Sequence, residues 1–379
     1  MGAGSSAALA DHVALTRIVA RNIGISPQQL GAGLVSAGTG DFDDVLSFRR
    51  EHLHASSRWD DAAYLRWRYR FGDVAAGFGD MWVLRRGGET LGILGLENLR
   101  CVLDGSTLDG VRGMDLLVRR DLIDTGLGSW LNQCMLERFP FALAMGANVN
   151  SLGIVRRMFR PLPSRRTFTH PIDARPFAAR RWPRWRTVIA AASPLANGAL
   201  ALRTAWRMRG ALAGLHVEPV ARFTDAMLPV PIDADPAMAR VSRPAAHLNR
   251  RLLDNPRRSC QARTALRGRL PVGYVAWAFG ADSGGHTEMH IVDWQFEAPP
   301  VFRALLRAAV AEAASQGCSC VRAVLQDPEE QLIAEAAGFV SARDDDGRVT
   351  GVQAKDIALA QRLVRARWAL TDITDDADV

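Results

Sequence analysis

The sequence predicts an α/β sandwich, in which mixed and mostly antiparallel sheets are flanked by helices. The chain has 379 residues, 48% of them hydrophobic, which is enough for two domains of ordinary size with buried cores. Its two halves also repeat each other: AAYLRWRY at 62–69 matches AAHLNRRL at 245–252, Gly92 matches Gly273, and Phe159 matches Phe339. The offset stays at about 180 residues across these matches. We therefore expect two domains with the same order of elements.

The order of elements can be read in each half. A helix over 44–54 opens the first half, and the AAxL segment forms the next helix in both. Two strands joined by a Gly-containing turn follow, at 81–86 and 90–103 or at 259–266 and 270–279. Then come a third strand (113–118 or 288–296), a helix starting at 127 or 301, a buried strand (141–145 or 319–325) and a helix ending at Phe159 or Phe339.

The composition excludes several kinds of chemistry. The formal charge is +7, but Lys355 is the only lysine, so the basic residues are almost all arginine. This arginine bias does not by itself indicate a polyanionic partner, and we expect no nucleic-acid binding. A Walker-type phosphate loop, a Schiff-base enzyme and a kinase each need a lysine in a definite motif, and Lys355 lies in none of them.

The cysteines and the hydropathy pattern predict a cytoplasmic protein. Five cysteines do not make a disulfide framework, and no Cys/His set has the spacing of a structural zinc site. The N-terminus lacks the charged leader and apolar core of a signal peptide, and no run of about 18 apolar residues occurs. We expect a soluble protein, or one peripheral to the inner membrane.

A basic segment rich in tryptophan lies between the two halves. Residues 174–210 interleave Trp182, Trp185 and Trp206 with arginines, a pattern that fits either a helical linker packed on the domains or an amphipathic helix that touches a bilayer. Because Pro194 lacks the N–H that a helix interior needs, we expect it to interrupt the helix.

A glycine loop follows the third strand of the first half. In RRDLIDTGLGSWLNQCML (119–136), Gly126 and Gly128 lie where an apolar strand gives way to a helix. Glycines let a backbone approach phosphates, and the N–H groups at a helix start favour anions. The same pattern also fits a simple turn between a strand and a helix. The matching segment of the second half has no glycine, and Pro299 and Pro300 each remove an N–H donor.

This order of strands, glycine loop and helices resembles the GNAT acetyltransferase superfamily. Its most specific element is a Gln/Arg-x-x-Gly-x-Gly/Ala loop, which IDTGLG at 123–128 resembles apart from Ile123 at the leading position. YLRWRY at 64–69, HLNRRL at 247–252 and WALTDITDDAD at 368–378 further resemble elements of tandem GNAT-like proteins found with bacterial surface-polysaccharide genes.

The resemblance implies two tandem GNAT-like domains and one acyl-CoA site. The implied divisions are an N-terminal extension (1–40), a domain with the site (41–172), a helical linker (173–221) and a degenerate domain (222–379). Acetyl-CoA or another acyl-CoA would be the co-substrate, with no metal. The implied cofactor-binding residues are Leu117, Val118, Ile123, Thr125, Gly126, Leu127, Gly128, Ser129, Trp130, Asn148 and Asn150.

The implied reaction is acyl transfer to an amine of an amino sugar or a related surface-polysaccharide precursor. The amine must lose a proton, so a water chain or a carboxylate with a raised pKa is the expected base. Glu97 and Asp115 are the candidates; each could instead be an ordinary strand carboxylate paired with Arg100 or Arg112. With no tyrosine between 145 and 165, Asn150, Ser151 or a water would protonate the leaving thiolate.

Two alternative functions and two further residue groups remain. A tandem GNAT-like chain could be an aminoacyl-tRNA-dependent peptidoglycan-type aminoacyltransferase, or a non-catalytic scaffold. Cys318 and Cys320 are expected in the core. His286, Glu288 and His290 are expected on one face of a strand, where they could line an acceptor pocket; without a third ligand, a two-His metal site is not expected.

Overall fold

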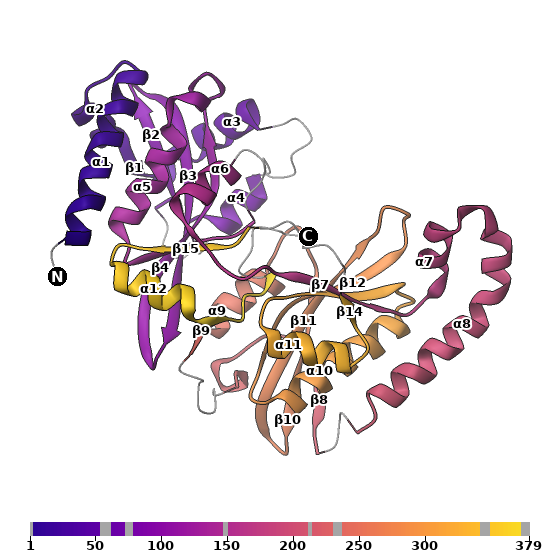
Figure 1. The fold of residues 1–379 in the computed structure, drawn as a ribbon. Coiled ribbons are helices and arrows are strands. Elements are labelled where there is room, and N and C mark those ends of the chain that lie inside the picture. Colours follow the sequence, from indigo (N-terminus) through magenta and orange to yellow (C-terminus); the bar gives the residue numbers. More distant parts are fainter. Residues whose placement is uncertain are drawn as a thin grey trace. The chain divides into compact units, whose positions relative to one another are not determined.

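The chain forms two mixed sheets, each covered by helices, as the repeat predicts. The computed structural model describes residues 3–53, 62–72, 79–146, 151–210, 214–229, 237–341 and 349–372 (Figure 1). It divides into unit 1 (Met1–Pro163, Pro236–Ser242, Arg348–Arg367) and unit 2 (Ser164–Asp235, Arg243–Gly347, Trp368–Val379).

Unit 1 contains the sheet β1-β2-β3-β4-β5-β15-β6, with β9 beside β3 and β16 beside β9. Its strands are β1 (Leu34–Ser36), β2 (Gly79–Arg86), β3 (Glu89–Leu103), β4 (Ser106–Val118), β5 (Phe141–Ala144), β6 (Arg160–Pro161), β9 (Met238–Val241), β15 (Gly351–Ala354) and β16 (Arg367–Trp368). Its helices are α1 (Ala3–Asn22), α2 (Pro27–Gly33), α3 (Phe42–His52), α4 (Ala62–Arg68), α5 (Leu127–Arg138), α6 (Leu152–Met158), α12 (Ile357–Arg365) and the 3-10 turns η1 (Thr39–Asp41) and η3 (Arg120–Thr125).

Unit 2 contains the sheet β14-β7-β13-β12-β11-β10-β8. Its strands are β7 (Arg166–Pro171), β8 (His216–Val220), β10 (Cys260–Arg267), β11 (Leu270–Ala281), β12 (Thr287–Phe296), β13 (Cys320–Leu325) and β14 (Val340–Ser341). Its helices are α7 (Ala174–Arg181), α8 (Arg186–Arg207), α9 (Ala245–Leu248), α10 (Pro299–Ser315), α11 (Pro328–Ala336), the 3-10 turns η4 (Pro183–Trp185) and η5 (Asp225–Met227), and the π-helical turn η6 (Asn249–Leu253).

The two sheets share one topology but exchange a strand. Each sheet has a run of antiparallel strands followed by one parallel pair, which is β4 with β5 in unit 1 and β12 with β13 in unit 2. The next position holds an antiparallel strand from the other half of the chain: β15 pairs with β5 and β6, whereas β7 pairs with β13 and β14. Each sheet is therefore completed by a segment that lies far away in sequence.

This exchange differs from the contiguous divisions expected from the sequence. The predicted range 41–172 includes β7, which joins the sheet of unit 2, and 222–379 includes β9 and β15, which join the sheet of unit 1. The segment 1–40 supplies β1, and the segment 173–221 supplies β8, so both contribute edge strands. The sheet that each of these strands joins is decided by hydrogen-bond partners that lie far away in the chain. The repeat in the sequence does not reveal those partners.

Alternating side chains give the sheet of unit 1 two buried faces. In β2 and β3, Val83 and Ile93 pack with residues of α3 and α4, whereas Trp82 and Leu94 pack with α1 and α5. The glycine loop therefore joins the α1–α5 face, where α5 begins.

Helix α8 continues through Pro194, contrary to the interruption expected from the sequence. A proline at this position cannot donate to the carbonyl of Ala190, one turn earlier. The Ser193 hydroxyl donates to that carbonyl instead, at 2.8 Å. The missing backbone bond is thus replaced, and the helix does not end.

In the part of the chain that the structure describes, no helix combines the length and the apolar character needed to cross a membrane.

Candidate functional site

The glycine loop forms a sharp turn into α5. After β4 the chain makes η3, and Gly126 then adopts φ 86° and ψ 5° as the residue that precedes the helix. The Thr125 hydroxyl donates to the Leu122 carbonyl at 2.6 Å, which holds the turn closed. A left-handed residue at this point suits glycine, because a Cβ disfavours positive φ.

Three backbone N–H groups at the start of α5 lie ahead of the first hydrogen bond of the helix. The first bond of the helix runs from the Trp130 N–H to the Gly126 carbonyl, at 3.0 Å. The N–H groups of Leu127, Gly128 and Ser129 precede it, and Gly126 has no side chain to cap them. These three groups and the helix dipole favour an anion here. The Trp130 amide was expected to face the cofactor, but it forms the first hydrogen bond of the helix.

Gly128 has a second role, in packing. A Cβ at this position would lie 3.2 Å from Cδ1 of Ile154 in α6 and 3.5 Å from Cδ2 of Leu116 in β4. The absent side chain lets the start of α5 lie close to α6 and β4. From the sequence, the two glycines fit either ligand approach or a simple turn, and the structure gives each one a local structural reason.

Strand β4 separates from β5 just before this loop. The parallel pair is formed at Val111 with Ala142 and at Arg112 with Leu143. Further along, β4 continues to Val118 paired with β3, while β5 ends at Ala144. Among the described strands, none pairs with the β5-facing edge of β4 at residues 113–118. Leu117 and Val118 lie on this segment and are half-buried. The expected cofactor-binding residues of β4 therefore lie just before those of the loop in the chain.

The arginines next to the loop are engaged by other groups. Arg119 forms two hydrogen bonds with Asp121, at 2.7 and 2.8 Å, and an ion pair with Glu89 at 2.5 Å. Arg120 donates to the Leu53 carbonyl at 3.2 Å. Two carboxylates therefore balance the charge of Arg119, whereas Arg120 donates to a neutral carbonyl and keeps its charge. Ile123, at the leading position of the motif, is exposed on η3.

Helix α1 packs against the loop, a feature that sequence reasoning did not identify. The Trp130 indole donates to the Thr16 hydroxyl at 3.0 Å, and the Asn22 amide donates to the Thr125 carbonyl at 3.1 Å. Val19 of the same helix lies 3.4 Å from the position of a Cβ on Gly126. No recognisable motif in the segment 1–40 points to these contacts. The indole of Trp130 is buried, so this side chain is structural.

Glu97 and Asp115 lie in a buried cluster with three arginines. Arg112 donates to Glu97, and Arg68 lies 3.8 Å from the same carboxylate oxygen. Asp115 accepts from the Tyr69 hydroxyl and pairs with Arg49 at 3.5 Å. The structure thus brings the two expected carboxylates together on the α3–α4 face, each beside arginines. The pairing of Glu97 with Arg112 is the structural alternative anticipated from the sequence.

Asp115 has unusual backbone and electrostatic surroundings. Its φ is 49°, and β3 and β4 shift register at this point, between Ile93 and Gly95, so Asp115 lies in a bulge of β4. Burial alone would raise the pKa of the Asp115 carboxyl, but Arg49, the Tyr69 hydroxyl and Arg68 together lower it below its usual value. Asp115 therefore lacks the raised pKa expected of a general base.

The remaining expected residues lie near the end of β5. Asn148 and Asn150 fall outside the residues that the structure describes. Ser151 directly precedes α6, and its carbonyl accepts from the Val155 N–H at 3.0 Å.

The corresponding helix of unit 2 begins differently. Pro299 and Pro300 occupy the first two positions of α10. The Val301 N–H already donates to the Ala298 carbonyl at 2.9 Å, and Phe302 contacts the same carbonyl at 3.4 Å. The first turn of α10 thus offers none of the donors that Leu127, Gly128 and Ser129 provide in α5, as the proline pair predicts.

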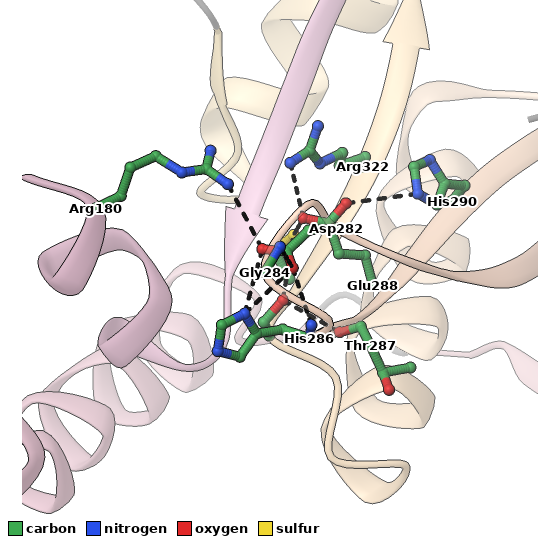
Figure 2. A network of polar contacts seen from close by, with 10 residues as sticks. Arg180, Asp282, Gly284, His286, Thr287, Glu288, His290 and Arg322 are labelled. Carbon is green, nitrogen blue, oxygen red and sulfur yellow. Dashed lines mark hydrogen bonds and ion pairs between the residues drawn. The ribbon is translucent and has the colours of Figure 1, made fainter.

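His286 and His290 of unit 2 contact different carboxylates (Figure 2). Glu288 and His290 share a face of β12 and lie 3.6 Å apart, and Arg322 donates to Glu288 at 2.7 Å. His286 precedes the strand and contacts Asp282 at 3.2 Å, so it does not share that face as expected.

Two cysteines lie in the core of unit 2. Burial, with Glu288 nearby, raises the pKa of the Cys320 thiol to about 11, and Cys318 is buried too. Both therefore behave as core residues at neutral pH. Across the described residues, no three His, Cys, Asp or Glu side chains are grouped so that they could hold a metal ion.

No protein-family model matches this sequence, and no curated protein sequence matches it. Solved structures do. A GCN5-related N-acetyltransferase from Anabaena variabilis has a TM-score of 0.55 at 13% identity, over 88% of this chain and 74% of that one. An Enterococcus faecalis protein described as a probable N-acyltransferase gives 0.51 at 7% identity, over 86% and 72%. A GCN5-related N-acetyltransferase from Kribbella flavida gives 0.50 at 15%, also over 86% and 72%. At these identities the likeness concerns the fold alone: the chain has the fold of the GCN5-related N-acetyltransferases.

Proposed function

We propose that this protein is an acyl-CoA-dependent N-acyltransferase with a single donor site, in unit 1. The observation that carries the proposal is the contrast between two equivalent helices. Helix α5 presents the N–H groups of Leu127, Gly128 and Ser129 after a left-handed glycine, whereas α10 begins with two prolines. The fold supports the reaction class, because two of the similar structures are described as N-acetyltransferases and the third as a probable N-acyltransferase.

The loop suits a diphosphate mainly through its backbone. The three N–H groups point out of the start of α5, and the helix dipole adds a partial positive charge there. The side chain of Arg119, held by Asp121 and Glu89, is not available as a second source of charge. The edge of β4 at 113–118 would supply backbone partners to the amide groups of the pantetheine arm. The donor is acetyl-CoA in this proposal, bound by β4 and the loop.

Transfer would be direct. The acceptor amine first gives one proton to a water, and the neutral nitrogen then attacks the thioester carbonyl carbon. The C–S bond breaks, and the nitrogen gives up a second proton, which balances the one that the thiolate takes up. Because Arg49, the Tyr69 hydroxyl and Arg68 lower the pKa of Asp115, this carboxylate would hold Arg49 and Tyr69 in place and would not act as the base, so a water takes the proton. Glu97 is enclosed by arginines, so it would position Arg112 and Arg68 and would not act as the base. Ser151 or a water would protonate the departing thiolate.

The acceptor class is an amino sugar or a related precursor of a surface polysaccharide. This choice rests on the resemblance of YLRWRY and of the C-terminal WALTDITDDAD to elements of tandem proteins of that kind. Transfer to nitrogen is chosen because the similar structures are described as N-acetyltransferases or as a probable N-acyltransferase.

Titration calorimetry with acetyl-CoA tests the donor site. Ser129→Pro removes one of the three N–H groups within the first helical turn, where proline is tolerated best. Ser129→Ala is the matched control, because it removes the hydroxyl and keeps the N–H. We expect Ser129→Pro to weaken binding by about tenfold, as for one lost hydrogen bond to a charged group, with little change for Ser129→Ala.

Three results would contradict this site. The wild-type protein could fail to bind millimolar acetyl-CoA, the two variants could bind equally, or Ser129→Ala could lose as much affinity as Ser129→Pro. Thermal unfolding of both variants shows that the comparison is made between folded proteins. Failure of acetyl-CoA to bind would favour the alternatives of an aminoacyl-tRNA donor, detected as salt-dependent tRNA binding, or a non-catalytic scaffold.

A further inference from the structure

Helix α8 presents large apolar side chains to solvent. Val188, Leu195, Leu202 and Trp206 have exposed fractions of 56, 83, 75 and 73%. They recur at intervals of seven, seven and four residues, so they form one stripe along the helix. Several alanines on the same face, including Ala192 and Ala199, are exposed as well. A continuous apolar stripe on a surface marks an interaction site, because isolated exposed residues do not align in this way.

A different face of α8 packs on unit 2. The buried and half-buried positions include Ile189, Ser193, Leu200, Thr204 and Met208, which follow helical spacing on the side away from the stripe. The Thr204 hydroxyl lies 3.2 Å from the His170 ring of β7, and Arg207 donates to the Glu335 carbonyl of α11 at 3.4 Å. The helix is therefore held by its inner face, and the exposed stripe is not needed to hold it.

The segment just before α8 continues this surface. Trp182 and Trp185, at the end of α7 and in η4, are both exposed. Arg180 of α7 lies 3.5 Å from Asp282 in the loop between β11 and β12, so α7 is also tied to unit 2 (Figure 2). Tryptophan prefers the boundary between water and hydrocarbon, because its ring is apolar and its N–H is polar.

The charge of the segment favours an anionic partner. Residues 174–210 contain eight arginines and no aspartate, glutamate or lysine. Arg181, Arg184, Arg186 and Arg209 are exposed, close to the tryptophans and the apolar stripe. Two copies of this surface would bring like charges together, which disfavours self-association. An anionic lipid surface complements the arginines and accepts the apolar stripe at the same time.

We propose that α7, η4 and α8 form a membrane-docking surface that lies on an anionic bilayer. The helix axis lies in the plane of the interface, the stripe from Val188 to Trp206 enters the region of the headgroups and upper acyl chains, and the flanking arginines contact lipid phosphates. The proposal does not depend on acyltransferase activity.

Vesicle co-sedimentation of the full chain tests this surface. The probes are vesicles of equimolar phosphatidylglycerol and phosphatidylcholine, compared with phosphatidylcholine alone. We expect the wild type to sediment with the anionic vesicles and to be released by salt. The double variant Leu195→Glu/Leu202→Glu should partition at least ~10-fold less, because it places two carboxylates in the stripe. Leu270→Glu is the matched control: Leu270 is 71% exposed at the start of β11, outside this segment, and its variant should bind like the wild type.

A second pair of substitutions separates charge from apolar contact. Arg184→Glu/Arg186→Glu should weaken binding to anionic vesicles by about tenfold or more and leave the weak binding to neutral vesicles unchanged. The proposal is overturned if the wild type stays in the supernatant with anionic vesicles, or if the Leu195/Leu202 variant sediments as the wild type does. It is also overturned if sedimentation velocity shows a wild-type dimer that this variant dissociates while vesicles are ignored, because the occupant of the stripe is then a second copy.

Discussion

Gly126 shows how one residue sets the geometry of the candidate site. With φ 86°, it turns the chain from η3 into α5 and leaves the next three N–H groups outside the helical ladder. A Cβ at this position would meet only Val19 Cγ2, at an ordinary contact distance of 3.4 Å. The backbone conformation, and not a lack of space, is therefore the reason for glycine.

Gly126→Ala should lower the free energy of unfolding by about 1–2 kcal/mol, the cost of a left-handed conformation for a residue with a Cβ. Gly153→Ala is the control, because Gly153 lies in helix α6 with no atom within 4 Å of a built Cβ. That substitution should stabilise the protein by about 0.5–1 kcal/mol. Urea unfolding of the three proteins measures both effects. Equal stability of Gly126→Ala and the wild type would contradict the assigned conformation.

The carboxylates show where residue-level prediction reaches its limit. The strand pattern correctly placed Glu97 and Asp115 in neighbouring strands, and Arg112 was a foreseen partner. Arg49 and Arg68 were not foreseen, since they come from helices that precede the strands. A signal did exist: Arg68 and Arg251 occupy the same position of the repeated AAxLxxR element, and both are buried. An arginine retained on an otherwise apolar helix face indicates a buried ionic partner.

Among the elements, long amphipathic helices and long strands were predicted best. Helix α10 and strands β3 and β11 have clear periodicity, and they begin or end within a few residues of the prediction, as does the less amphipathic α5. The short strands β1, β7, β8 and β15 were not predicted as strands, although β5 and β13, which are as short, were. The difference is that β5 and β13 are buried runs that follow a predicted helix in both halves of the repeat, whereas the other four lie outside the repeated order of elements. Pro194 misled the prediction for α8, because the compensating bond comes from a side chain.

A double-mutant cycle at Ser193 and Pro194 tests that compensation. Ser193→Ala should cost about 1 kcal/mol, because the Ala190 carbonyl loses its donor. In a Pro194→Ala background the same change should cost much less, because the residue that replaces the proline has a backbone N–H, which then donates to that carbonyl. Thermal unfolding of the four proteins gives the coupling energy. An equal cost of Ser193→Ala in both backgrounds would show that the hydroxyl does not replace the backbone bond.

On the scale of the whole chain, the main difference from expectation is the exchange of strands. The repeat revealed two similar sheets, but the sequence of a strand as short as β15 does not indicate which sheet it joins. Its membership is decided by pairing with β5 and β6, which lie about two hundred residues earlier in the chain. The two sheets are therefore folding units that contiguous fragments do not contain, since 1–163 lacks β9 and β15.

Val352→Asp tests the exchange, because it places a carboxylate at a fully buried position of β15. We expect a loss of about 3 kcal/mol in stability, as for an unpaired buried charge. Hydrogen exchange should accelerate in β5 of unit 1, whose Leu143 pairs with Val352, while β13 of unit 2 stays protected although it is closer in sequence. Gln361→Asp, on an exposed position of α12, introduces the same group as a control and should leave both strands protected. Acceleration in β13 with protection of β5 would instead mean that each half folds from contiguous sequence, because β15 would then belong to the sheet of the residues nearest to it in the chain.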